Sequence, residues 1–172
     1  MNNGKTVWTG ALIRIAIFLG AFAMLQLSWQ ALHGGRVERA VIDDFTVRPA
    51  AYLANLITPS VTVRAEGSSL RAPGGGLNIL NGCEGVEVLF LLLAAFTVAP
   101  LPWRSRVLGM LYGAAVVFVI NQARVLALFY AYRADHLLFD RLHATITPIA
   151  VVILIGLYFY AWLSRAASNQ TA

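Results

Sequence analysis

The sequence predicts an all-α integral membrane protein in which about four transmembrane helices form one bundle. Of the 172 residues, 59% are hydrophobic and only 12% are charged, whereas a soluble domain has about 25% charged residues. Four apolar stretches also approach the ~20 residues that cross the hydrocarbon core of a bilayer. We therefore expect a single membrane domain over residues 1–172, with an extracytoplasmic amphipathic helix and a small β-hairpin flap after the first span.

The expected spans lie at about residues 11–32, 84–101, 107–130 and 144–163. The first has no small-residue cleavage site after a short apolar core and contains Gln26 and Gln30. We therefore interpret it as a retained helix that can double as an uncleaved signal. The second is short unless it extends back towards Cys83. In the third, Gly109 and Gly113 have the spacing of a small-residue face that packs closely against neighbouring helices.

The distribution of arginines predicts which helix ends face the cytoplasm. The short loop at residues 100–106 contains Arg104 and Arg106 and no acidic residue, and the positive-inside tendency places such a loop in the cytoplasm. Both chain termini then also lie inside, and residues 33–82 and about 131–143 lie outside. The five arginines of residues 33–82 argue against this orientation, but four acidic residues nearly balance them and long segments follow the tendency weakly.

The first half of the outer segment, residues 33–82, has a helical pattern. Val37, Val41 and Phe45 recur at one-turn intervals opposite charged residues. This pattern predicts an amphipathic helix that lies on the membrane or on the bundle. The Arg48-Pro49 pair should interrupt the helix, and residues 51–57 can resume it.

The second half of the outer segment predicts strands. Residues 61–65 alternate between apolar and polar, residues 67–69 offer a turn, and a glycine-rich turn precedes residues 77–80. These signals predict a β-hairpin or a three-stranded flap. We expect the flap to shape a groove beside Cys83, and the alternative is a passive spacer.

Several classes of site find no support in the sequence. The net charge is +5 with a pI near 9.9, but the arginines are scattered instead of gathered in a stripe, so we expect no nucleic-acid partner. The single cysteine and dispersed histidines form no ligand pair of metal-site spacing. The glycines of residues 74–76 lack the Lys-Ser/Thr and the helix that follow a phosphate-binding loop. We expect no cofactor and no metal.

Cys83 is the only cysteine, and it lies in Asn81-Gly82-Cys83-Glu84-Gly85, where a glycine-rich stretch meets an apolar run. A thiol at a helix N-terminus has a lowered pKa, and the flanking glycines would let a substrate backbone approach. Glu84 and Glu87 argue against a reactive thiol, because a nearby carboxylate raises the thiol pKa; either acid can instead pair with an arginine. The alternative for Cys83 is a small buried hydrophobic residue.

Arg124 is a cation inside an apolar helix. At ~1.5 Å per residue it lies about 25 Å beyond Val107, near the outer edge of the hydrocarbon core. Asn121, three residues earlier, shares its helix face. Both side chains could donate hydrogen bonds to a tetrahedral oxyanion at Cys83, a role worth ~3 kcal/mol per donor. The alternatives are a snorkelling arginine or an ion pair with one of the two acids, Glu84 or Glu87.

His136 and His143 are candidate bases. They are two helical turns apart, so on a continuous helix they could share a face, and the residues alone do not decide between them. His143 opens the last apolar run, at the depth expected for Cys83, and a Cys–His pair would permit general-base activation and protonation of a leaving group. The alternative for His143 is an interfacial histidine without a chemical role.

These residues, in this order, resemble the exosortase/archaeosortase family of polytopic membrane cysteine transpeptidases. The resemblance covers about residues 70–163 and rests on Asn-Gly-Cys83-Glu-Gly at an outer helix start, Asn121-x-x-Arg124 in the next helix and His143 at the start of the last. The resemblance implies three catalytic residues: Cys83 as the nucleophile, Arg124 as the essential cation and His143 as the third. The chain is similar to the short stand-alone branch, the exosortase H or M types, because larger members have about twice as many helices. Many relatives carry a small polar residue where this chain has Glu84.

The resemblance also implies substrates and a location. Such enzymes recognise a C-terminal signal made of a short motif, a transmembrane helix and a basic tail, cleave near the motif and transfer the new C-terminus to an acceptor. We therefore expect membrane-anchored substrate proteins and the lipid bilayer as partners, and a multi-pass location in the bacterial inner membrane with the site facing the periplasm. The alternative function is a non-catalytic assembly or scaffold protein of an envelope polysaccharide system.

Overall fold

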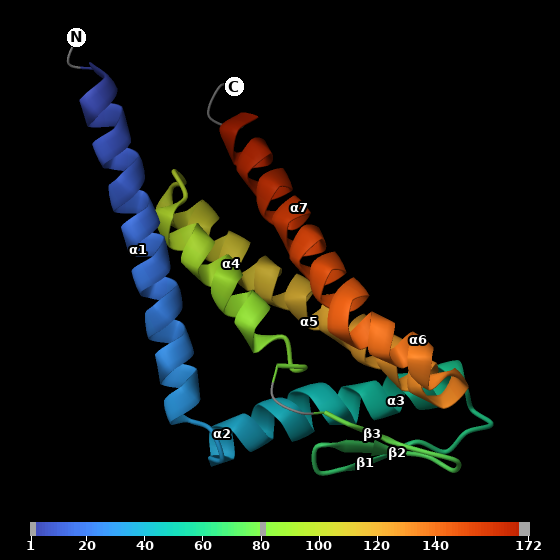
Figure 1. The fold of residues 1–172 in the computed structure, drawn as a ribbon. Helices are drawn as coiled ribbons and strands as arrows, with labels where there is room; N and C mark the ends of the chain where they lie inside the picture. Colours follow the sequence, from blue (N-terminus) through green and yellow to red (C-terminus); the bar gives the residue numbers. More distant parts are fainter. Residues whose placement is uncertain (1–2, 80–81, 169–172) are drawn as a thin grey trace.

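The computed structural model describes residues 3–79 and 82–168 (Figure 1). Its helices are α1 (Asn3–Ala31), α2 (Arg36–Arg39), the π-helical η1 (Ala40–Val47), α3 (Arg48–Ile57), α4 (Val86–Val98), α5 (Trp103–Ala134), α6 (His136–Arg141), the π-helical η2 (Leu142–Ile146) and α7 (Thr147–Ser168). Its strands are β1 (Arg64–Glu66), β2 (Ser69–Arg71) and β3 (Leu77–Asn78). The predicted helical membrane fold with a small sheet is confirmed.

Three helical segments of the described chain are long and apolar enough to cross a membrane: Trp8–Ala31, Trp103–Ala134 and His136–Ala166. The second expected span, residues 84–101, instead forms the shorter apolar helix α4 of 13 residues. At 1.5 Å per residue, α4 is about 20 Å long, less than the ~30 Å hydrocarbon core. The bundle therefore combines three helices of membrane-spanning length with one short helix. Residues 82–85, which lead into α4, lie between the bundle and α3 (Figure 1).

Helices α4, α5 and α7 pack together through the glycines of α5. A Cβ atom at Gly109 would lie 2.6 Å from the Phe96 ring of α4 and 2.7 Å from the indole nitrogen of Trp162 in α7. A Cβ at Gly113 would lie 2.5 Å from a methyl carbon of Leu92. Real Cβ atoms do not approach neighbours this closely, so the predicted close-packing role of both glycines is confirmed.

Helices α2, η1 and α3 join without a gap into one outer helical segment, residues 36–57, which crosses the end of the bundle (Figure 1). The amphipathic helix is present, but the predicted interruption at Arg48-Pro49 is wrong. Pro49 has no N–H to offer the carbonyl of Phe45, four residues earlier, and that carbonyl instead accepts a hydrogen bond of 3.1 Å from Nε2 of Gln122 in α5. Pro49 also follows the π-helical turns of η1 and lies in the first turn of α3. Proline is tolerated in a first turn, where its missing N–H would have no partner within the helix.

The three strands form an antiparallel sheet in the order β1-β2-β3, which confirms the predicted flap. The strands are shorter than predicted, and Leu80, the expected end of the last one, lies outside the described residues. Asn55 of α3 holds the chain that enters β1: its side-chain nitrogen donates to the carbonyl of Val63 and its oxygen accepts from the amide of Val63, each at 2.8 Å. The flap is therefore fixed to the outer helical segment.

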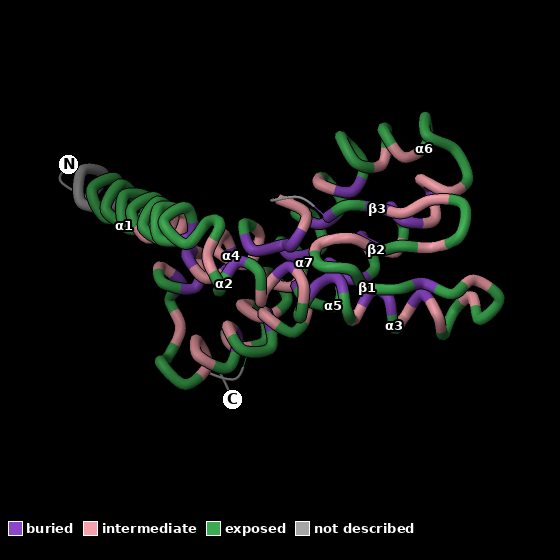
Figure 2. The backbone as a smooth tube through the Cα atoms, turned by 90° about the horizontal axis from the view of Figure 1, so that it is seen from below, coloured by how far each residue is buried: buried purple, intermediate pink, exposed green. Residues whose placement is uncertain are grey.

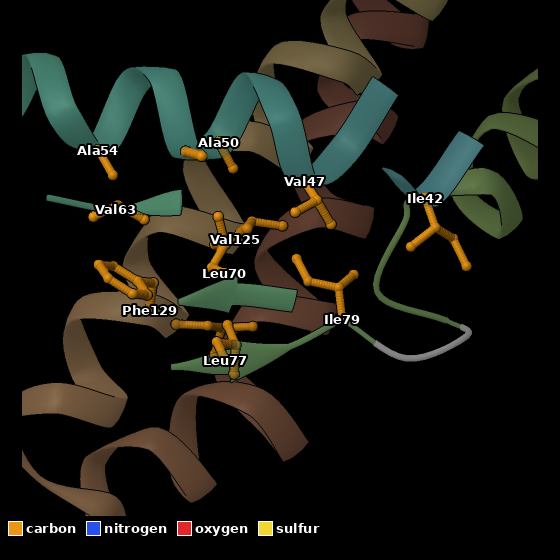
Figure 3. Close-up of a cluster of buried hydrophobic side chains, with 12 residues drawn as sticks. Ile42, Val47, Ala50, Ala54, Val63, Leu70, Leu77, Ile79, Val125 and Phe129 are labelled. Carbon is orange, nitrogen blue, oxygen red and sulfur yellow. The ribbon is translucent and has the colours of Figure 1, made fainter. Parts of the chain in front are cut away.

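A hydrophobic core joins the outer helical segment, the sheet and α5 (Figure 3). Leu70 of β2 is fully buried, Val125 and Phe129 of α5 are each 1% exposed, and Ala54 contributes from α3. Figure 2 shows the buried positions gathered where these elements meet, whereas most of α1 is exposed. Cys83 packs against the same core, so the fold of the outer layer sets the position of the thiol.

The two ends of the molecule agree with the sidedness predicted from the arginines. The start of α1, the α4–α5 loop and the end of α7 lie towards one end, and the outer helical segment, the sheet and α6 lie at the other (Figure 1). Which of the two ends faces the cytoplasm stays a prediction.

Enlarging Gly113 should destabilise the bundle. We expect Gly113→Leu to cost ~1–3 kcal/mol, because overpacking forces neighbouring side chains and backbone to shift. The control is Gly156→Leu in α7, where a Cβ would meet no atom within 4 Å. The midpoint of thermal unfolding in detergent should fall clearly for the first variant and little for the second. Equal midpoints for both variants would contradict the packing.

Candidate active site

A cavity of about 420 Å³ lies between the sheet and the bundle. Its walls come from β3, the segment before α4, α5, α6 and η2, and they consist of Leu77, Asn78, Ile79, Gly82, Cys83, Arg124, Val125, Leu128, Phe139 and His143. The structure thus brings together the thiol, the guanidinium and the imidazole predicted from the sequence. They belong to three segments that are far apart along the chain.

The loop that carries Cys83 depends on two glycines in the left-handed region. Gly82 has φ +91° and Gly85 has φ +80°, a conformation that costs other residues energy. A Cβ at Gly85 would also lie 2.9 Å from Cγ of Asn121. These glycines are therefore required to shape the loop, and the access that they would give to a substrate backbone stays a prediction.

The pKa of the Cys83 thiol is raised, which contradicts the expected lowering by a helix N-terminus. The first residue of α4 is Val86, with Gly85 as its N-cap, so Cys83 lies two residues before the cap. Burial raises the thiol pKa most, the positive charge of Arg124 opposes this effect, and Glu84 raises the pKa further. Desolvation disfavours the thiolate, and a dipole acting mainly within the first turn does not reverse it. The raised pKa favours the protonated thiol.

The guanidinium of Arg124 contacts three separate parts of the site. Its Nη2 lies 4.0 Å from Sγ of Cys83, its Nη1 donates to the carbonyl of Gly82 at 3.3 Å, and its Nε donates to the hydroxyl of Thr147 at 3.3 Å. Among the described residues, no ion pair joins Arg124 to Glu84 or Glu87. The charge of Arg124 is therefore directed at the thiol and at neutral oxygen atoms.

His143 and His136 have different surroundings. His143 lies in the π-helical turn η2, lines the cavity with Cys83, and stacks in parallel on Phe139 with ring centroids 5.4 Å apart. His136 packs edge-on against Tyr132 at 4.7 Å and is not part of the cavity wall. Single π-helical turns are frequent at functional sites. The geometry therefore favours His143 as the base, although no hydrogen bond joins it to Cys83 in the described structure.

The three supporting residues suggested by the sequence lie outside this cavity. Asn121 and Glu84 line a second cavity of about 200 Å³; they are 4% and 7% exposed. Within the described chain, Oδ1 of Asn121 and Oε2 of Glu84 have no hydrogen-bond partner. Glu87 is exposed in the first turn of α4. Asn121 packs against Gly85, so its place supports a role in shaping the loop instead of a role as oxyanion donor. Asn81 lies outside the described residues.

Sequence reasoning missed Thr147 and Phe139. Thr147 is 8% exposed and accepts the hydrogen bond from Arg124, and Phe139 supports the ring of His143. Both lie four residues from His143, a spacing that places side chains on one helix face. The four-residue spacing could have predicted that these side chains lie beside His143. That prediction requires one continuous helix through His143, which the sequence alone does not establish.

The described residues hold no cluster of three or more His, Cys, Asp or Glu side chains suited to a metal ion. The chemistry available in the cavity is that of a thiol, a cation and an imidazole. A thiol supplies a nucleophile, an imidazole moves protons and a guanidinium stabilises negative charge. This set fits covalent acyl transfer.

Comparison with known proteins agrees with this set. The family model described as transmembrane exosortase matches residues 9–160. No match was found among curated proteins or among solved structures. The matched region runs from α1 into α7 and includes Cys83, Arg124 and His143, so it extends well beyond the residues on which the resemblance was first noted. The chain therefore belongs to the transmembrane exosortase family.

Proposed function

We propose that this protein is a membrane-embedded cysteine protease/transpeptidase. Its substrates are proteins with a C-terminal signal of motif, transmembrane helix and basic tail, which it cleaves and sorts at the outer face of the cytoplasmic membrane. One observation carries the proposal: a single cavity contains Cys83, Arg124 and His143. Membership of the exosortase family supports a membrane exosortase-like role.

The first half of the reaction forms a thioester. His143 accepts the proton of the Cys83 thiol, and the sulfur attacks the carbonyl carbon of the scissile peptide bond. The carbonyl oxygen becomes an oxyanion, to which the donors of Arg124 are offered. Collapse of this intermediate breaks the C–N bond, and His143 returns its proton to the leaving amine. The substrate's new C-terminus is then bonded to the sulfur of Cys83.

The second half of the reaction resolves the thioester. An amine or hydroxyl acceptor, or water, attacks the thioester carbonyl while His143 removes its proton. The C–S bond breaks, and the thiolate leaves and is reprotonated. Because burial raises the pKa of Cys83 and so favours the protonated thiol, a base is needed to start each cycle. This requirement gives His143 its role.

Removing the thiol should abolish processing without unfolding the protein. Cys83→Ala and Cys83→Ser keep a small side chain in a half-buried position and remove the nucleophile. The measurement is co-expression with a candidate substrate, followed by determination of the mass and C-terminus of that substrate. Full processing by membrane-inserted Cys83→Ala would favour the alternative, a non-catalytic scaffold protein.

Arg124→Lys should lower turnover at least ~10-fold, because lysine keeps the charge but loses the planar fork of donors that reaches three partners. Arg133→Lys is a matched control on the same helix, since Arg133 donates to the carbonyl of Pro73 and lies outside the cavity wall. Turnover is measured as substrate cleaved per amount of inserted protein. Near-normal turnover by Arg124→Lys would make Arg124 a structural cation.

The pH dependence of thiol alkylation should report the electrostatics of Cys83. In the detergent-solubilised protein, the rate of reaction with iodoacetamide should rise with pH to a midpoint above that of an ordinary thiol, because the folded-state pKa is raised. Arg124→Gln should move the midpoint to higher pH by removing the charge that opposes this shift. Glu84→Gln should move it to lower pH by removing the carboxylate. Shifts of the opposite sign would refute this account of the thiol.

A further inference from the structure

One edge of the sheet borders the active-site cavity. In the order β1-β2-β3, the outer edges belong to β1 and β3. Leu77 and Asn78 of β3 line the cavity, and Phe139 of α6 and His143 of η2 line it as well. In Figure 2, α6 lies beyond β3 on the side away from β2. The cavity therefore lies along a strand edge that no strand covers.

The register shows which backbone groups face this edge. The amide of Ile79 donates to the carbonyl of Ser68 at 2.8 Å, and Leu77 pairs with Leu70 of β2. In an antiparallel pair, alternate residues direct both backbone groups to the same neighbour. Leu77 and Ile79 thus face β2, and the N–H and C=O of Asn78 face the free edge.

No described residue bonds to these two backbone groups of Asn78. The side-chain oxygen of Asn78 is already used, since it accepts hydrogen bonds from the hydroxyls of Ser68 at 3.1 Å and Ser69 at 3.3 Å. The main chain of Asn78 therefore remains as the unused donor and acceptor pair at the cavity.

An open strand edge is a template for another strand, and proteins usually cover or blunt such edges. Here the edge stays open beside a nucleophile. An extended peptide that adds to an edge gains affinity from main-chain hydrogen bonds and specificity from pockets for alternate side chains. Val125, Leu128 and Phe139 supply apolar walls for such side chains.

We propose that β3 binds the recognition motif of the substrate as a fourth strand, in which the backbone of Asn78 pairs with the peptide and leads the scissile carbonyl to Cys83. The ligand class is a short extended peptide with apolar side chains at alternate positions. This inference rests on the proposed function, because it names how that substrate is held.

Disulfide trapping tests the pairing without turnover. Cys83 is the only cysteine, so Cys83→Ala with Asn78→Cys leaves one thiol at the free edge. Cys83→Ala with Ala65→Cys is the matched control, because Ala65 pairs with Leu70 in the middle of β1, the opposite edge strand. The probe is a co-expressed, cysteine-free reporter that ends in a candidate motif, helix and basic tail, with single cysteines placed along the motif.

We expect disulfides from Asn78→Cys at alternate motif positions, and none from Ala65→Cys. Equal trapping at both edges, or no trapping of a reporter that the wild-type protein cleaves, would overturn the strand pairing and leave the proposed function intact. Failure of the wild-type protein to cleave any such reporter, together with no trapping, would overturn both.

Proline substitution separates backbone binding from side-chain binding. Asn78→Pro removes the outward N–H, and edge strands accept proline where the N–H faces away from the sheet. We expect its KM for the reporter to rise at least ~5-fold through loss of this hydrogen bond, with little change in kcat. Asn78→Ala keeps the N–H, so its KM should rise less than that of Asn78→Pro, and Ala65→Pro at the other edge should stay near the wild-type KM. An unchanged KM for Asn78→Pro, with a normal unfolding midpoint, would refute the proposal.

Discussion

The guanidinium of Arg124 is the contact on which the geometry of the site depends. It joins the loop before α4, the thiol of Cys83 and the start of α7, and none of these partners is a carboxylate. No ion pair to Arg124 is present among residues 3–79 and 82–168, and an unpaired cation is costly inside a membrane bundle. The free-energy cost of the unpaired charge therefore remains. In the proposed reaction, the same charge is available to stabilise the thiolate or the oxyanion that forms beside it. A buried ion pair would have neutralised this charge before any chemistry began.

Side-chain amides hold the outer helical segment and the sheet in place where the backbone departs from regular helix or strand. Pro49 withholds a donor from the carbonyl of Phe45, and Gln122 of α5 supplies one. Asn55 holds the chain at Val63 with two hydrogen bonds. The cavity is therefore bounded on one side by a flap that is fixed to the outer helical segment, and Gln122 ties that segment to the bundle. Since β3 is both a wall of this cavity and the strand that leads towards Cys83, a shift of the flap would move the nucleophile and the proposed peptide-binding edge together.

Much of the fold and the three candidate catalytic residues could be predicted, because the signals are local. Apolar runs reveal helices in a membrane, and a thiol, a cation and a histidine are conspicuous beside them. The errors arose where tertiary contacts decide. Pro49 is tolerated in part because Gln122 of a distant helix bonds the carbonyl of Phe45. Helix α4 is the exception with a local cause, since it ends at Val98, just before Ala99 and Pro100. Asn121 shares a helix face with Arg124, yet the loop at Gly85 separates them into different cavities.

The sequence left the direction of the Cys83 pKa open; it indicated the raising effect of Glu84 but not burial, which is the largest cause. The position near a helix N-terminus indicated a lowered thiol pKa, whereas burial outweighs the charge of Arg124 and raises it. Nucleophilic attack and oxidation both depend on the thiolate, so the raised pKa lowers the reactivity of Cys83 towards both. In the proposed mechanism, His143 takes this proton in the cavity that receives the peptide. In that mechanism the charge of Arg124, whose Nη2 lies 4.0 Å from Sγ of Cys83, lowers the energy of the thiolate once the proton has moved.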